Sequence, residues 1–229
     1  MHTVMRPKTL LRLAEMFYSL AAEKEKLPAN SKDLKTILKN LEELETYQAR
    51  KKYAEANLKH LSSGSSRIVY LTDAGTIVKL AKNDKGIAQN KVEANPKMKS
   101  KYLNKIISNA KNFDWIQTHF LEKIGVKEFE EMTDIPFEEF GEAIRYGLKG
   151  VSDSSSKKPK NFNEIAKTDF YKEMERVASK FKLLPGDIAR ISSWGTKDDL
   201  PILIDAGLTR DVYDDFYDSS SSWHIISII

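Results

Sequence analysis

Two short stretches near the end of the chain carry its chemistry: PGDIARIS at residues 185–192 and ILIDAG at residues 202–207. The first places Asp187 at the head of a polar loop, where a carboxylate can accept a proton from an attacking hydroxyl. The second ends an apolar run with Asp205 two residues before a glycine, where a carboxylate can hold Mg²⁺ against nucleotide phosphates. Asp-x-Gly also forms ordinary turns, so the pair needs support from upstream residues.

The composition is typical of a chain that folds around its own core. It has 229 residues, 41% of them hydrophobic, and no cysteine. The lack of cysteine excludes disulfides and thiolate catalysis, and it is compatible with the cytoplasm. The N-terminus lacks the apolar core of a signal peptide and no stretch has the length of a membrane span, so we expect a soluble protein without a membrane partner.

The formal net charge of +4 is unevenly spread. Residues 79–111 hold nine lysines against two acidic residues, and residues 198–218 hold seven aspartates against one arginine. The lysine-rich stretch is either a solvated face or a surface attracted to phosphate or nucleic acid. Aromatic residues are not interleaved with these lysines, so nucleic acid is a partner supported by charge alone.

Apolar residues among the first sixty recur with a helical period. One stripe runs over residues 7–25, and a second runs from Leu34 toward Leu58 after an expected N-cap at Ser31. The pattern predicts an N-terminal helical hairpin whose apolar stripe either packs within the chain or binds a protein partner. The apolar tail at residues 223–229 is a second candidate docking segment.

After Leu61 the helical period is replaced by β-branched runs, and beyond these runs segments with helical and strand patterns follow in turn. Residues 67–71 and 76–80 flank a turn and predict a β-hairpin. The remaining segments predict a helix from Ile87 past Ile106 interrupted near Pro96, a strand over 113–121, helix over 127–148, a flexible polar loop over 151–160, and a helix capped by Thr168 or Asp169.

This order of elements, over about residues 60–217, resembles the protein kinase-like superfamily, which includes small-molecule kinases of the aminoglycoside phosphotransferase type. The resemblance implies an α+β, reduced bilobal kinase-like fold with a small antiparallel sheet lobe and a mainly helical lobe. The expected division is a helical hairpin extension at 1–60, the sheet lobe at 61–122, the helical lobe at 123–218 and a tail at 219–229.

The family's glycine-rich loop, G-x-G-x-x-G-x-V, aligns with SSGSSRIV at residues 62–69. Only the middle glycine, Gly64, and the valine remain. The resemblance implies that Gly64 and Ser65 bind nucleotide phosphates, with the neighbouring serines Ser62 and Ser66 adding hydroxyls and Arg67 adding charge.

Ten residues after that valine, Lys79 matches the family's strand lysine, which contacts the α- and β-phosphates. Glu93, on the following helix, matches the carboxylate that holds such a lysine. An exposed strand lysine and a surface glutamate on a lysine-rich helix are the alternatives.

In the catalytic loop, the resemblance makes Asp187 the catalytic base. Ser192 stands where the family has an asparagine that binds the second metal, and a hydroxyl is a poorer Mg²⁺ ligand than an amide oxygen. Asp205 becomes the main metal ligand, and Ala206 replaces the family's phenylalanine. Arg190 either orients a phosphate, pairs with Asp205 or is simply exposed.

Two hypotheses remain. Only 24 residues follow Asp205 (229 minus 205), and none reads Ala-Pro-Glu, so we expect a small acceptor or a binding role. The first hypothesis is an ATP- and Mg²⁺-dependent kinase-like phosphotransferase of unknown acceptor. The second is a degenerate pseudokinase-like interaction or structural protein, resembling bacteriophage proteins of the virion or of host takeover. The expected location is cytoplasmic, meaning host cytoplasm or virion if the chain is phage-encoded. No P-loop motif occurs, and the four histidines are too scattered for a zinc site.

Overall fold

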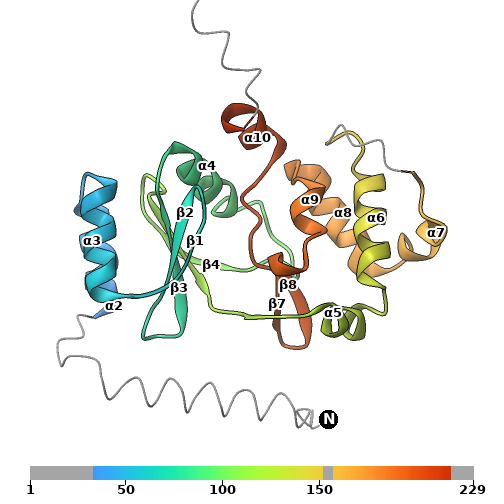
Figure 1. The fold of residues 1–229 in the computed structure, drawn as a ribbon, viewed down its shortest axis with the longest axis horizontal. Coiled ribbons are helices and arrows are strands. Elements are labelled where there is room, and N and C mark those ends of the chain that lie inside the picture. Colours follow the sequence, from blue (N-terminus) through green and yellow to red (C-terminus); the bar gives the residue numbers. More distant parts are fainter. Residues whose placement is uncertain (1–32, 152–156, 218–229) are drawn as a thin grey trace, which may run out of the picture.

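The computed structural model describes residues 33–151 and 157–217. Two hydrophobic cores divide this part of the chain into two lobes, one built on a five-stranded sheet and one on helices with a small three-stranded sheet (Figure 1). The predicted α+β, bilobal fold is confirmed. The predicted helix over 7–25, the N-cap at Ser31 and the apolar tail at 223–229 lie outside the described residues.

The large sheet is antiparallel throughout, with strand order β1-β2-β3-β5-β4. The predicted hairpin is confirmed as β2 and β3, joined by a turn in which Gly75 has φ of 69°. The strands are β1 (Lys59–Ser63), β2 (Arg67–Leu71), β3 (Thr76–Ala81), β4 (Ile106–Asn109) and β5 (Trp115–His119).

Two helices, α2 (Leu34–Glu43) and α3 (Tyr47–Asn57), lie beside this sheet and share its core (Figure 1). The predicted continuous stripe from Leu34 to Leu58 was wrong, because the chain leaves helical geometry at residues 44–46. There Thr46 has an extended backbone and its Oγ1 accepts a hydrogen bond from the amide of Ala49 at 3.2 Å, which starts a new helix.

A buried ion pair joins these helices to the sheet. Arg50 NH2, on α3, lies 2.8 Å from Asp114 Oδ1 at the start of β5, and both side chains are less than a tenth exposed. Arg50 NH1 also donates to the carbonyl of Leu44 at 2.6 Å, so the same guanidinium closes the break between α2 and α3.

The helix expected from Ile87 past Ile106 is also shorter than predicted. Helix α4 (Asp84–Glu93) ends before Pro96, and Ile106 begins strand β4 instead. A proline cannot donate the hydrogen bond that a helix interior needs, and the β-branched pair Ile106 and Ile107 fits an edge strand paired with β5.

The second lobe packs helices around buried aromatic rings. Phe129, Phe140, Phe170 and Trp194 have ring centroids 5.2–5.9 Å apart, and the indole of Trp194 donates to the carbonyl of Ile188 at 2.8 Å. The helices are α5 (Val126–Thr133), α6 (Phe137–Gly147), α7 (Phe162–Ile165), α8 (Asp169–Phe181) and the single turn α9 (Pro185–Ile188).

Sequence periodicity predicted the helices of this lobe in part. The helical segment predicted over 127–148 is divided into α5 and α6 near Pro136, where Asp134 has φ of 55°. Thr168 caps α8 as predicted, accepting from the amide of Tyr171 at 3.2 Å.

A tight hairpin brings the end of the chain back toward the sheet lobe. Strands β6 (Glu122–Lys123), β7 (Trp194–Lys197) and β8 (Leu200–Leu203) form the small sheet. Asp198 and Asp199 make the two-residue turn with φ of 52° and 58°, the left-handed geometry that such hairpins require. Its register pairs Trp194 with Leu203 and so places Asp205, after β8, beside the loop before β7.

The last described helix, α10 (Arg210–Phe216), contacts both lobes (Figure 1). At its start, Leu208 accepts a backbone hydrogen bond from Leu184, and Arg210 donates one to Lys182 of the helical lobe. After it, the ring of Tyr217 lies 4.2 Å from Lys85 Nζ of α4, and its hydroxyl accepts from Gln89 at 3.3 Å. Among the described residues, no helix is long and apolar enough to cross a bilayer.

Replacing Arg50 with methionine tests the joint between the helices and the sheet. The variant leaves the Asp114 carboxylate buried without its cation, so we expect the free energy of unfolding to fall by about 3 kcal/mol. Urea denaturation measures it. The exposed pair of Arg176 and Glu173 supplies the control, since Arg176→Met should cost about 1 kcal/mol or less. Equal losses in the free energy of unfolding for the two variants would show that the buried pair stabilises the fold no more than the exposed pair does.

Candidate active site

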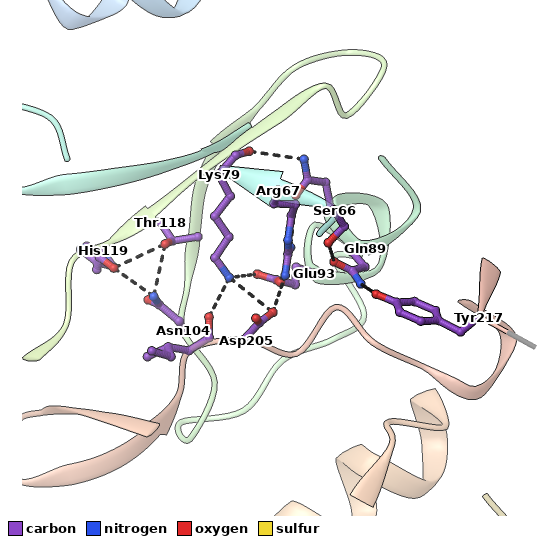
Figure 2. A network of polar contacts seen from close by, with 12 residues as sticks. Ser66, Arg67, Lys79, Gln89, Glu93, Asn104, Thr118, His119, Asp205 and Tyr217 are labelled. Atoms are coloured by element: carbon purple, nitrogen blue, oxygen red, sulfur yellow. Dashed lines mark hydrogen bonds and ion pairs between the residues drawn. The ribbon is translucent and has the colours of Figure 1, made fainter. Parts of the chain in front are cut away.

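Four charged side chains from both lobes meet in one cluster, which we call the ion cluster: Arg67, Lys79, Glu93 and Asp205 (Figure 2). Lys79 Nζ lies 2.7 Å from Glu93 Oε2 and 3.9 Å from Asp205 Oδ1. It also donates to the carbonyl of Ile204 at 2.7 Å. Lys79 is only 4% exposed, so the alternative of an exposed strand lysine does not hold.

Arg67 is the second cation of the cluster and is 6% exposed. Its NH1 donates to Glu93 Oε1 at 2.6 Å and to Asn90 Oδ1 at 3.2 Å. Its NH2 bonds to Asp205 Oδ1. The sequence resemblance expected Arg67 to add charge to the phosphate loop, whereas the structure uses it to join a helix carboxylate to the aspartate after β8.

The two cations share a face because of the strand register. Val69 lies opposite Lys79 across β2 and β3, and Arg67 follows the period of two on the same face as Val69. Arg67 and Lys79 are therefore diagonal neighbours, which the alternation in residues 67–71 and 76–80 could have revealed.

The charges set the ionisation of the cluster. Burial works against the charged form of Arg67, but Asp205 and Glu93 outweigh it and raise its pKa above the usual value. Burial likewise works against ionised Asp205, but Arg67 and Lys79 outweigh it and hold the pKa of that carboxyl well below its usual range. The Asp205 side chain keeps 58% of its surface exposed.

Two glycines allow other segments to lie directly against α4. A Cβ at Gly207 would come within 2.9 Å of the Gln89 carbonyl oxygen and 3.0 Å of Glu93 Oε1. A Cβ at Gly86 would come within 2.2 Å of the Ser66 carbonyl oxygen. The absence of side chains at these positions lets α4 contact the 64–67 turn at one end and the Asp205 segment at the other.

Ile204 links the lobes through its backbone alone. Its amide donates to the carbonyl of Ser193 at 2.9 Å in the helical lobe, and its carbonyl accepts from Lys79 in the sheet lobe. A backbone role of this kind has no side-chain signature, so sequence reasoning missed it.

Asp187 lies on α9 and is partly buried. Burial raises its pKa; Arg190 lowers it, the negative charge of Asp205 raises it further, and Arg67 lowers it. The balance leaves the pKa of Asp187 above its ordinary value. Arg190 NH1 lies 3.6 Å from Asp187 Oδ1, so its partner in the structure is Asp187 rather than Asp205.

Beside Asp187 lies an open depression of about 400 Å³. Two arginines and an aromatic ring line it together with the backbone of the α9 turn. The lining residues are Leu184, Pro185, Gly186, Asp187, Arg190, Leu208, Arg210 and Tyr213.

The turn that was aligned with the phosphate loop is held against α4. The amide of Gly64 donates to the carbonyl of Arg67 at 2.9 Å, and Lys82 Nζ donates to the carbonyl of Gly64 at 2.5 Å. Ser66, expected to offer its hydroxyl to phosphate, is buried and donates to Gln89 Oε1 at 2.8 Å. Ser65 is exposed at the tip of the turn.

The residues expected to bind Mg²⁺ do not form a metal site as they are arranged. Asp205 Oδ1 is already bonded to Arg67, and Lys79 adds a second positive charge beside it. Ser192 is exposed on the 3₁₀ turn Ile191–Ser193. In the described ranges 33–151 and 157–217, no group of three or more His, Cys, Asp or Glu residues could hold a metal ion. Two cations beside one carboxylate oppose a divalent ion.

No family model and no curated protein matches the chain. Two solved structures are similar at low identity. The aminoglycoside phosphotransferase APH(2'')-Ib with ADP bound is 15% identical, has a TM-score of 0.35, and the match covers 75% of this chain and 74% of that chain. The streptomycin–ATP ternary complex of APH(2'')-IIa is 16% identical, has a TM-score of 0.32, and the match covers 66% of each chain.

The fold and the cluster combine a two-lobed α+β architecture with charged groups drawn from both lobes. A lysine on the third strand of an antiparallel sheet pairs with a glutamate on the next helix, and both face an aspartate that follows the hairpin of a second, helical lobe. The structure brings Lys79, Glu93 and Asp205 into contact, and the charge of Asp205 contributes to the raised pKa of Asp187. Ser192, the expected second metal ligand, precedes Ser193 in the chain. The carbonyl of Ser193 accepts a hydrogen bond from the amide of Ile204, the residue before Asp205.

Substituting Gly207 with alanine tests the close approach to α4. The added Cβ meets backbone and carboxylate atoms, so we expect the free energy of unfolding to fall by about 1–3 kcal/mol. Urea denaturation measures the change. Gly150 serves as the control, because a Cβ added there would meet nothing within 4 Å and Gly150→Ala should be nearly neutral. Similar values for both variants would contradict the close approach.

A pH series tests the charge on Asp205. Because its pKa is lower in the folded chain, its ionised form stabilises the fold above the unfolded pKa of about 4 and loses that effect as the pH falls through the folded value. We expect Asp205→Asn to be less stable than the wild type at neutral pH, with a difference that shrinks below about pH 4. A difference independent of pH in urea denaturation would contradict this.

Proposed function

We propose that the chain is a kinase-like protein that binds ATP between its lobes and transfers the γ-phosphoryl group to a hydroxyl of a small acceptor. The observation that carries the proposal is the formed pair of Lys79 and Glu93 facing Asp205, with Asp187 nearby. Phosphoryl transfer depends on positioning and charge stabilisation more than on covalent chemistry, and this cluster supplies both.

On the nucleotide side, Lys79 is the candidate contact to the α- and β-phosphates, with Glu93 holding its ammonium in place. Gly64 and Ser65 are the candidates at the turn between β1 and β2. Ser65 is exposed there, and a Cβ at Gly64 would meet nothing closer than 3.8 Å, so a ligand can approach this turn.

On the acceptor side, Asp187 is the candidate general base. A raised pKa makes a carboxylate a better proton acceptor, and the nearby Arg190 orients it. The depression beside Asp187 is of a size that fits a small molecule.

Of the two proposed cofactors, ATP and Mg²⁺, the metal ion fits the described arrangement less well. Asp205 and Ser192 are the residues that the kinase resemblance assigns to it, and Mg²⁺ would supply positive charge to the phosphates there. Direct binding of Mg²⁺ by Asp205 would compete with Arg67 for Oδ1.

A second candidate function is a nucleotide-binding or degenerate pseudokinase-like protein that acts by interaction. The bond between Arg67 and Asp205 and the serine at position 192 favour it. Its protein partner would bind through residues 1–60 or 223–229.

Turnover of the wild type separates the two candidates, and the Asp187→Asn variant tests the proposed base. We expect this variant to bind ATP as tightly as the wild type, because Asp187 contacts the acceptor, and to lose about a hundredfold or more in phosphoryl transfer, because the base is gone. Calorimetric titration with ATP measures binding, and phosphate released or transferred from ATP measures turnover. Wild-type binding without turnover would favour the interaction protein, and turnover unchanged in the variant would remove Asp187 from the mechanism.

A further inference from the structure

The position where a kinase-like site uses a divalent cation already contains a cation of the chain itself. Arg67 NH2 bonds to Asp205 Oδ1, and its NH1 bonds to Glu93 Oε1 (Figure 2). The guanidinium therefore lies between the two carboxylates of the ion cluster and joins the two lobes.

The fold holds this guanidinium firmly. Arg67 is 6% exposed, and Asn90 Oδ1 accepts a third bond from it. Asn90 is itself fixed, because its Nδ2 donates to the carbonyl of Phe113 at 2.9 Å. Withdrawing Arg67 would leave Asn90 Oδ1 and one oxygen of Glu93 without this donor in a buried setting, which is unfavourable.

The charges of the cluster explain what Arg67 contributes. Arg67 and Lys79 carry two positive charges, and Glu93 and Asp205 carry two negative charges, so the cluster is neutral. Without Arg67 its net charge would be −1, and a nucleotide polyphosphate approaching Asp205 would be repelled unless a cation came with it.

We propose that Arg67 takes the place of the divalent cation at Asp205, so that this chain binds nucleotide phosphates without requiring Mg²⁺. The inference rests on the proposed nucleotide site and adds its cofactor specificity. Oδ1 of Asp205 is engaged by Arg67, so a metal ion would have to bind the remaining oxygen beside the positive charges of Arg67 and Lys79, which repel it.

The test compares ATP affinity in Mg²⁺ and in EDTA by calorimetric titration. For the wild type we expect dissociation constants within about threefold of each other. For Arg67→Gln, whose cluster carries −1, we expect ATP to bind about tenfold or more weakly in EDTA and to recover when Mg²⁺ is added. Arg67→Lys keeps the charge but loses the forked guanidinium, so we expect only its ratio of ATP affinities in Mg²⁺ and EDTA, and not its stability, to match the wild type. Arg176→Gln, on the exposed face of α8, is the control and should match the wild type.

A double variant tests the charge argument itself. Arg67→Gln with Asp205→Asn restores a neutral cluster made of Lys79 and Glu93, so the requirement for Mg²⁺ seen in Arg67→Gln should disappear. This outcome distinguishes a charge effect from a loss of shape, because the double variant lacks both partners of the bond.

Several outcomes would overturn the inference. A wild type that binds ATP only with Mg²⁺ contradicts it directly, and this arm stands even if Arg67→Gln does not fold. Equal affinities of Arg67→Gln in Mg²⁺ and EDTA also contradict it. If ATP binds to none of these proteins in either condition, the nucleotide site itself is wrong and the inference fails with it. Strict dependence on Mg²⁺ in every variant would overturn the role of Arg67 while leaving the proposed nucleotide site intact.

Discussion

The cost of burying a guanidinium is the constraint on which the centre of this molecule depends. Arg67 cannot lose its proton, so a chain that buries it in the sheet lobe must surround it with hydrogen-bond acceptors. Glu93 and Asn90 from α4 meet part of that need, and Asp205 from the other lobe meets the rest. The orientation of α4 and the path of the chain after β8 are therefore linked by one side chain.

Independent cores position the two halves of the cluster. Arg67 and Lys79 follow the register of β2 and β3, whose other face packs against α2 and α3. Asp205 follows the β7–β8 hairpin, and Trp194 anchors that hairpin in the aromatic core of the helical lobe. A buried ion pair stabilises less than its Coulomb energy suggests, because both ions lose water. Its larger effect here is geometric, since the contacts of Arg67 and Lys79 with Asp205 hold the two lobes in register.

Local patterns predicted much of this structure, and the failures have identifiable causes. Two β-branched runs around a turn predicted the β2–β3 hairpin, and the resemblance to kinases predicted that Glu93 would hold Lys79. The stripe from Leu34 to Leu58 hid a helix break, because periodicity does not show where Thr46 caps a new helix. The helix was predicted to continue past Ile106, but Ile106 begins strand β4, which pairs with β5. The bonds of Arg67 to α4 and to Asp205 were not predicted, because these partners lie 23 to 138 residues away in sequence. Residue type gives no sign of such contacts.

Helix α10 has a consequence for motion between the lobes. The chain passes between them at residues 119–122, and the segment before α10 returns to the helical lobe while Tyr217 rests on Lys85 and Gln89 of the sheet lobe. The ion cluster and the backbone of Ile204 also join the lobes, so Tyr217 adds a contact at a separate point. Separating the lobes on the α10 side must first lift an aromatic ring from a lysine. The contacts of Tyr217 with Lys85 and Gln89 thus oppose the separation of the two lobes on this side.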